Sequence, residues 1–465
     1  MKRFFAFIAA LLLCLLAGAA GAEHAPFFPA KGENGKWGYI DRQGRFVIPA
    51  QFDYAFEFRG NYAEVVLFPE DWTGSRNVYD GGHDGIIDRS GALVLPPEYN
   101  LIGEQDESWF GGRDTGIWCV LGTETEGFFD IPSGYFSGLK WHNVYQRGAK
   151  ESRLIPVIDE TYRAGSADLS TGELVIPCLY ESVDPSSFAG GVAAVCPIPP
   201  ETEDEPAEDE EETAYEFILI DETGAEIPLP EGIHAVRYEG AHENRVVVVD
   251  DHELYGYADA AGNLIIPPQF ACAKAFEGGF AVVRFPEDDW GCVDPDGRVL
   301  VRGLAADHWD GPKFRNGMYT RRTAPQTFSV IDLQGKTVMT FSTDNLEALY
   351  PPNSRGLCLF AEATDSISGV DYGFVDLTGW IVVDAELGLD WFQEPSEGLL
   401  PVWRKADGIW MSGYMDESGQ MVLPPVYDAA DDFDNGLARV WIGNRCGYID
   451  HDGQEVYFWN EEEEE

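Results

Sequence analysis

The chain has 465 residues and a formal net charge of −50, with 81 Asp and Glu against 31 Lys and Arg. An electrostatic field this negative repels nucleic acid and anionic membrane surfaces, which argues against both as partners. The same charge favours solubility and the binding of cations or basic partners.

The first 22 residues are typical of a signal peptide. Lys2 and Arg3 give a basic start, residues 4–16 are apolar, and Ala20-Gly21-Ala22 offers a small-residue cleavage site. The apolar run is shorter than the roughly 20 residues that a membrane-spanning helix needs, and no later segment is a candidate. We therefore expect a secreted protein, extracellular or associated with the cell envelope, without membrane insertion. Cleavage removes two basic residues and gives the mature chain a net charge of −52.

One short phrase recurs through the rest of the chain: an apolar run that ends in Asp, a Gly, and a second apolar run. Its first copy spans residues 37–49. The aspartates that end the first run are Asp41, Asp88, Asp130, Asp168, Asp221, Asp259, Asp294, Asp332, Asp376, Asp416 and Asp450. Their mean spacing is about 41 residues, and periods of roughly 20–50 residues indicate solenoids, propellers or arrays of one stacked unit.

Each Asp is predicted to begin a tight turn. Asp at the first turn position and Gly at the fourth suit a type I turn followed by a left-handed residue, the usual three-residue hairpin loop. We assign this structural role to the pairs Asp41 and Gly44, Asp88 and Gly91, Asp259 and Gly262, Asp294 and Gly297, Asp416 and Gly419, and Asp450 and Gly453. After Asp130 and Asp168 the Gly comes one residue later, so those two turns are predicted to be one residue longer.

Two further pieces complete the unit. In several copies a Pro stands five residues after the turn Gly and an aromatic follows, as in Pro49 and Phe52. Pro lacks a backbone donor, so we expect it to end the strand and the aromatic to fold back as an anchor. An aromatic, a Gly and another strand come next, as at residues 276–283. Because helix-period patterns are missing, the sequence predicts an all-β chain of about 40-residue units with three to four strands each.

These phrases carry a resemblance to a known family. K-W-G-Y-I-D-R-Q-G at 36–44, I-I-P-P-Q-F at 265–270 and D-N-G-L-A-R-V-W at 434–441 resemble the WG β-repeat family of bacterial proteins. The resemblance implies repeated β-units that mediate interactions, with no shared catalytic residues or cofactor.

The length of the unit and its three to four strands match a propeller blade, yet the ends of the chain do not offer complementary halves of one blade. The sequence leaves a closed ring and an open β-array undecided. It divides into the leader 1–22, repeats over 23–198, an acidic disordered linker at 199–214, repeats over 215–460 and an acidic tail at 461–465. Insertions are predicted to collect at one turn of the unit, between the Gly turn and the next Asp.

Signatures of catalysis and of metal binding are absent from the sequence. It contains no H-E-x-x-H, G-x-S-x-G or C-x-x-C motif, so we predict no catalytic, cofactor-binding or metal residues and no enzyme. Asp294-x-Asp296 and Asp450-x-Asp452 resemble the start of calcium loops, but they lack the later acidic ligands and are explained by turn chemistry. The acidity leaves weak, diffuse calcium binding as an open hypothesis.

Tryptophans in the insertions are the remaining functional candidates. Trp72, Trp403 and Trp410 lie in or beside insertions and form a candidate interaction rim for a protein, a peptide or a cell-wall glycan. Indole rings are favoured at interfaces because an apolar body carries a polar N–H. Two alternatives stay open: the indoles fill cores in a structural acidic spacer, or the protein is an extracellular hydrolase.

Overall fold

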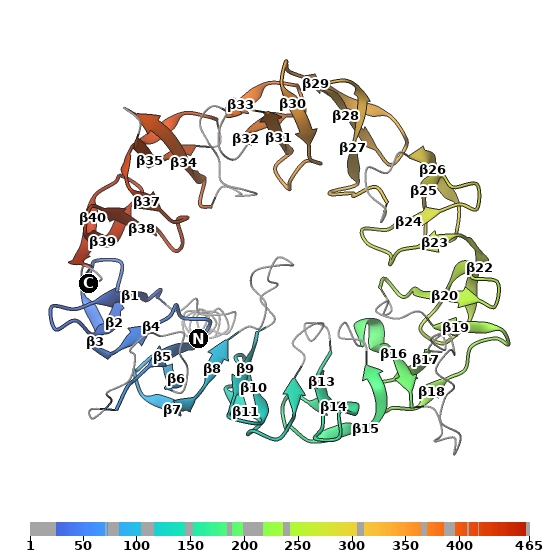
Figure 1. The fold of residues 1–465 in the computed structure, drawn as a ribbon, viewed down its shortest axis with the longest axis horizontal. Helices are drawn as coiled ribbons and strands as arrows, with labels where there is room; N and C mark the ends of the chain where they lie inside the picture. The colour runs from blue at the N-terminus through green and yellow to red at the C-terminus, as the bar shows by residue number, and fades with distance from the viewer. Residues whose placement is uncertain are drawn as a thin grey trace, which may run out of the picture.

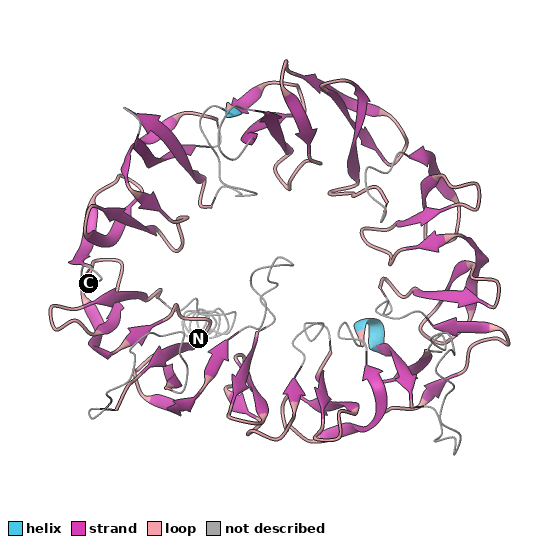
Figure 2. Cartoon of the chain, in the orientation of Figure 1, coloured by secondary structure: helices cyan, strands magenta, loops and turns pink. Residues whose placement is uncertain are grey.

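The computed structural model is built almost entirely from β-strands (Figure 2). It describes residues 25–69, 72, 83–103, 116–144, 152–183, 188–198, 217–235, 242–304, 311–363, 370–385, 396–406, 409–416 and 418–461. The predicted signal peptide at 1–22 and acidic linker at 199–214 lie outside the described residues, as does all but the first residue of the tail 461–465. Within the described part, no helix has the length and apolar character to cross a membrane.

The strands form ten antiparallel sheets. The first four sheets contain β1 (Phe28–Lys31), β2 (Trp37–Ile40) and β3 (Phe46–Phe52); β4 (Tyr54–Ala55), β5 (Tyr62–Val66), β6 (Asp84–Asp88) and β7 (Leu93–Tyr99); β8 (Leu101–Gly103), β9 (Ile117–Leu121), β10 (Glu126–Asp130) and β11 (Tyr135–Phe136); and β12 (Asn143–Val144), β13 (Leu154–Ile158), β14 (Ala164–Asp168), β15 (Leu174–Val183), β16 (Val192–Pro197), β17 (Ile218–Asp221) and β18 (Glu226–Ile227). A 3-10 turn, η2 (Ala189–Gly191), precedes β16.

The remaining six sheets repeat the same order of three or four strands. They contain β19 (Ile233–Ala235), β20 (Val246–Asp250), β21 (Tyr255–Ala258) and β22 (Leu264–Phe270); β23 (Cys272–Ala273), β24 (Ala281–Arg284), β25 (Trp290–Val293) and β26 (Val299–Leu304); β27 (Met318–Ala324), β28 (Thr327–Asp332) and β29 (Thr337–Ser342); β30 (Leu346–Leu349), β31 (Leu357–Ala363), β32 (Val370–Asp376) and β33 (Ile381–Val383); β34 (Leu399–Ala406), β35 (Ile409–Asp416) and β36 (Met421–Tyr427); and β37 (Ala429–Ala430), β38 (Leu437–Ile442), β39 (Arg445–Asp450) and β40 (Glu455–Asn460).

Each of the eleven aspartates stands at the end of the third strand of a four-strand pattern or directly after it, before the turn into the fourth strand. We call the strands around each aspartate a unit and number the units in chain order. The seven-stranded sheet joins the fourth and fifth units through β15 and β16. The predicted all-β array of three- to four-stranded units is therefore confirmed.

The aspartate side chains close these turns as local chemistry demands. In the first unit, Asp41 Oδ1 accepts the backbone N–H groups of Gln43 at 2.9 Å and Arg45 at 3.0 Å, and Gly44 adopts a φ of 74°. The same two acceptor contacts, to residues two and four positions later, recur at Asp88, Asp221, Asp259, Asp294, Asp332, Asp376, Asp416 and Asp450. An Asx-type bond of this kind replaces ladder partners that a tight turn cannot supply.

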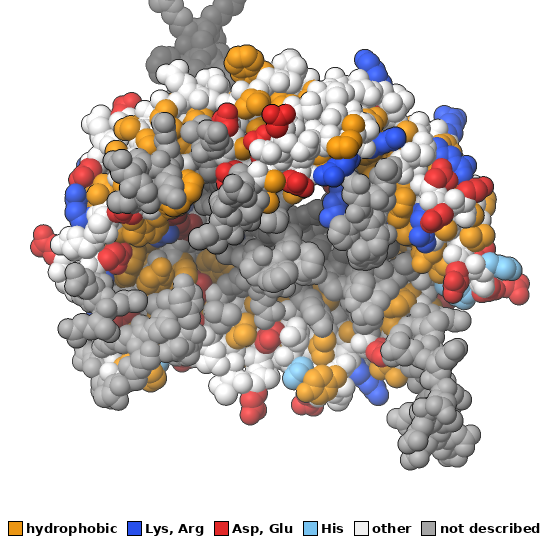
Figure 3. All heavy atoms as spheres, turned by 45° about the horizontal axis from the view of Figure 1, so that its top comes forward, with side chains coloured by type: hydrophobic (Ala, Val, Ile, Leu, Met, Phe, Trp, Pro, Cys, Tyr) orange, Lys and Arg blue, Asp and Glu red, His pale blue; other side chains and the backbone are white. Residues whose placement is uncertain are grey.

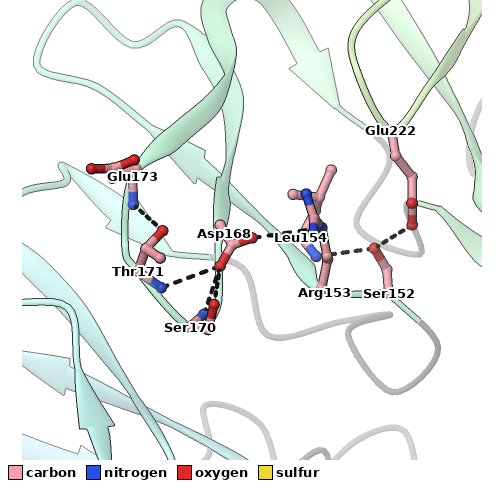
Figure 4. Close-up of polar contacts among 8 residues, drawn as sticks. All are labelled: Ser152, Arg153, Leu154, Asp168, Ser170, Thr171, Glu173 and Glu222. Atoms are coloured by element: carbon pink, nitrogen blue, oxygen red, sulfur yellow. Dashed lines mark hydrogen bonds and ion pairs between the residues drawn. The ribbon is translucent and has the colours of Figure 1, made fainter.

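The turn after Asp168 is one residue longer, as its spacing predicts (Figure 4). The backbone N–H of Asp168 donates to the carbonyl oxygen of Glu173, five residues later. In the first unit, the N–H of Asp41 donates to the carbonyl oxygen of Arg45, four residues later. Asp168 Oδ1 accepts the N–H groups of Ser170 and Thr171 at 2.9 and 3.2 Å. The Ser170 hydroxyl also donates to Asp168 Oδ1, and this hydrogen bond is the main cause that lowers the pKa of the carboxyl, with help from Arg153.

The prediction that proline ends the return strand is wrong. Pro49 lies inside β3, which continues to Phe52, and the pairing of β2 with β3 shifts register beside it. β3 is the last strand of its sheet, so a missing N–H on its outer edge breaks no ladder bond. The following aromatic is the expected anchor: Phe52 is buried, as are Phe270 and Tyr427 in their units.

The units follow a nearly circular path, with the fourth strands toward the outside and the first sheet beside the last (Figure 1). Trp459 of β40 packs against Trp37 of β2 with ring centroids 5.6 Å apart, and both belong to one buried cluster. Among the described residues no strand of the first sheet pairs with one of the last, so a blade shared between the termini is not present. The array ends meet through side chains.

Removing the hydroxyl of Tyr448 should test this junction. The buried hydroxyl donates a hydrogen bond to Pro29 O at 3.0 Å, across 419 residues of sequence. Because Tyr448→Phe leaves that carbonyl without its partner, we expect the free energy of unfolding to fall by about 1–2 kcal/mol in urea denaturation. Tyr457→Phe, whose less buried hydroxyl donates to Lys31 O, is the control with a smaller expected loss. Equal stability of Tyr448→Phe and the parent chain would contradict the assignment.

The acidic insertion does not interrupt the sheets around it. β16 before the insertion pairs with β17 after it, from Val192 opposite Asp221 to Val195 opposite Ile218. The described residues on its two sides therefore share one sheet. Insertions also occur elsewhere in the unit: β8 ends at Gly103 and β9 begins only at Ile117. The prediction that insertions collect at a single turn is incomplete.

Candidate functional site

The first rim tryptophan, Trp72, belongs to a small aromatic cluster in the connection between β5 and β6. Its ring stacks on Phe68 at 6.0 Å and meets His83 edge-on at 4.5 Å, and 38% of the side chain is exposed. The base of the cluster is fixed because Asp53 accepts the N–H of Phe68 at 3.0 Å and pairs with Lys36. The Trp72 indole is therefore held at the surface by packing against Phe68 and His83, and Asp53 fixes the backbone at Phe68.

The other two rim tryptophans lie near the tip of the β34–β35 hairpin, in the tenth unit. Trp403 pairs in register with Ser412, and Lys405 with Trp410. Since side chains alternate along a strand, the two indoles lie diagonally on the same face of the hairpin. Trp410 is 45% exposed and Trp403 is half-buried.

These three indoles lie toward the same end of their units. Trp72 lies in the connection between the second and third strands, and Trp403 and Trp410 lie in the two strands that flank the same connection of the tenth unit. The second and tenth units lie on either side of the first and eleventh units, whose sheets meet at the terminal junction (Figure 1). Residues more than 300 positions apart therefore face the same edge of the array across two units.

The remaining tryptophans divide into core and surface residues. Trp141 is buried in the core between the third and fourth units, and Trp109, Trp309 and Trp391 lie outside the described residues. Sequence analysis missed Trp380, which is 70% exposed at the turn after Asp376. Its position, four residues after a turn Asp, is held by an exposed polar residue in six other units, and that equivalence was the available signal. These residues are Arg45, Asn263, Arg298, Lys336, Gln420 and Gln454. It lies at the opposite end of its unit from the rim.

A pair of buried carboxyls lies on the face of the second unit that meets the third unit. Val66 pairs with Asp84 and Glu64 with Ile86, so Glu64 and Asp84 are diagonal neighbours on one face of β5 and β6. Glu64 is 8% exposed and Asp84 2%. Burial, reinforced by Asp84, raises the pKa of Glu64 to about 9, and burial raises the pKa of Asp84 to about 7. Across the described residues, no group of three or more potential metal ligands occurs.

The two calcium-like motifs are folded as hairpin turns. Asp294 Oδ1 accepts the N–H groups of Asp296 and Arg298 at 3.0 and 2.8 Å, and Asp450 Oδ1 makes the equivalent contacts. One oxygen of each first aspartate is thus engaged by the backbone of its own turn.

The solved structures that match this chain share little sequence with it. A crystal structure of a eukaryotic initiation factor matches with 10% identity and a TM-score of 0.40, covering 77% of this chain and 95% of that one. BamB from Moraxella catarrhalis matches with 12% identity and a TM-score of 0.28, covering 65% and 92%. Dihydro-heme d1 dehydrogenase NirN in complex with DHE matches with 14% identity and a TM-score of 0.28, covering 94% and 78%. No curated protein matches the sequence.

A family model described as "WG containing repeat" matches five stretches, at residues 37–67, 85–108, 170–196, 255–285 and 413–446. Four of them begin on the third strand of one unit and all five reach into the next unit. The chain therefore contains five copies of the WG-containing repeat, distributed from the first unit to the eleventh.

Proposed function

We propose that this protein is an exported, non-catalytic interaction module that binds a protein, a peptide or a cell-wall glycan through Trp72, Trp403 and Trp410. The observation that carries the proposal is the exposure of Trp72 and Trp410 in or beside equivalent connections of units near the terminal junction. Flat indoles on such an edge supply apolar area with little loss of side-chain freedom. The leader at 1–22 supports export.

The rim is tested by titrating purified cell-wall glycan and secreted proteins against the chain and its Trp72→Ala and Trp410→Ala variants. Loss of an indole anchor typically costs about 2 kcal/mol of binding, so we expect affinity to fall at least tenfold for each variant, with unchanged thermal melting. Trp380→Ala removes a more exposed indole outside the rim and should leave affinity unchanged. Lower melting temperatures with no change in any interaction would favour the structural-spacer alternative.

A further inference from the structure

The eighth unit has a net positive charge, whereas the whole chain is strongly negative. Residues 311–342, all of them described, contain five basic side chains and the single acid Asp332. The basic residues are exposed: Lys313, Arg315, Arg321, Arg322 and Lys336. The carboxylate of Asp332 accepts the N–H groups of Gln334 and Lys336 inside its turn. In Figure 3, where this part of the array faces forward, Lys and Arg side chains gather at the upper right.

The outer strand of the same unit has an open edge. β29 is last in the order β27-β28-β29, and within the described part of the chain it pairs with β28 alone. Other outer strands carry proline five residues after the turn Gly, at Pro49, Pro96, Pro177, Pro267 and Pro424. In β29 that position, five residues after Gly335, is Thr340, so the strand keeps its backbone donor there.

Two other long outer strands without proline, β26 and β40, lack this combination. Arg302 of β26 is engaged by Glu287 and Asp289 at 2.6 and 2.8 Å. β40 begins at the acidic Glu455 and contacts the first unit, where Tyr457 donates to Lys31 O. Along β29, Val338, Thr340 and Ser342 alternate outward while Met339 and Phe341 are buried, the pattern of a regular half-buried strand.

We propose that the outer edge of β29 binds an extended acidic peptide segment of a partner protein as an added strand. Main-chain hydrogen bonds to a free edge give affinity in this mode of recognition, and side chains give selectivity. The cationic surface around Arg321 and Lys336 attracts carboxylates. A short peptide fits better than a long polyanion. Salt screens electrostatic attraction over about 8 Å, so the attraction of the basic side chains is confined to this unit. A longer polyanion would extend onto the acidic surfaces of the neighbouring units and be repelled there.

The test uses fluorescence anisotropy of a labelled eight-residue peptide of alternating Glu and Val, with the full chain in excess. We expect micromolar affinity that weakens with salt and at least tenfold weaker binding to Thr340→Pro, which installs the proline of the other units. Lys336→Glu combined with Arg321→Glu should weaken binding similarly while leaving the edge intact. Arg163→Glu, an exposed basic residue of the fourth unit, is the matched control and should bind like the parent chain.

Equal binding by all variants, or equal binding of a Lys and Val peptide, would overturn the proposal. Salt-sensitive dimerisation in sedimentation that Lys336→Glu abolishes would also overturn it, because the occupant would then be a second copy of the chain. If Thr340→Pro has a lower melting temperature than the parent chain, the test rests on the peptide affinity of the variant that combines Lys336→Glu with Arg321→Glu. Trp72→Ala should leave peptide binding unchanged, so failure here is separable from failure of the aromatic rim.

Discussion

Gly413→Ala is expected to lower the free energy of unfolding by about 2–3 kcal/mol, although it adds only one methyl group. A Cβ at this position would stand 2.6 Å from Leu423 O and 2.7 Å from Pro425 N, both backbone atoms of the neighbouring strand β36. Backbone in a paired sheet cannot move aside as a flexible side chain can, so β35 and β36 must separate locally. Urea denaturation of the variant against the parent chain measures the loss.

Gly443→Ala is the matched control for this prediction. Gly443 has a φ of 60°, and a Cβ there meets nothing within 4 Å. Only the left-handed backbone is then penalised, which costs about 1 kcal/mol. If both variants lose the same stability, close approach of the backbone is not what Gly413 provides.

The second large expectation is a fall in stability as pH rises from about 4 to 9. Glu64 and Asp84 have folded-state pKa values raised from 4.5 to about 9 and from 3.8 to about 7. Below pH 3.8 both are protonated in both states and the stability they contribute is complete. Within the window the folded state binds more protons than the unfolded state, so each group can remove about 1.4 kcal/mol per pH unit. Thermal melts at half-unit pH steps would record the decline.

Glu64→Gln should flatten this dependence. Glutamine resembles the protonated acid in shape and stays neutral, so we expect a higher melting temperature than the parent chain at pH 8.5 and little difference at pH 4.5. Glu98→Gln alters an exposed residue of the same unit and should leave the profile unchanged. A parallel shift of Glu64→Gln at every pH would show that packing, and not ionisation, is responsible.

The sequence predicted the turns well because their chemistry is local. An Asp and a Gly three residues later fix a hairpin loop through two hydrogen bonds and one left-handed residue, as Asp41 and Gly44 do. The longer turn at Asp168 followed from counting alone. Proline was misjudged because its effect depends on whether a strand has one neighbour or two, which the sequence of a single unit does not show.

Features that depend on contacts between units were harder to predict. A glycine recurs in the third strand, three residues before the turn Asp, because the return strand passes too close there for a Cβ. It stands at Gly38, Gly85, Gly256, Gly291, Gly373, Gly413 and Gly447. The burial of Glu64 and Asp84 requires the third unit to pack on the second, and the meeting of Trp37 with Trp459 requires the curvature of the whole array. Trp72 and Trp410 were singled out from the sequence because they lie in or beside insertions. Trp380 was missed because it stands in an ordinary turn with no insertion near it.

The terminal junction, where the first unit meets the eleventh, has a mechanical consequence. Inside a sheet, separating strands means breaking a series of backbone bonds, whereas the described residues at the terminal junction hold together through apolar packing and hydroxyl contacts such as that of Tyr448. Tension applied between the termini would therefore part the first unit from the last before any strand is stripped from its sheet. The array would uncurl as a chain of intact units and could spring back when the load is released.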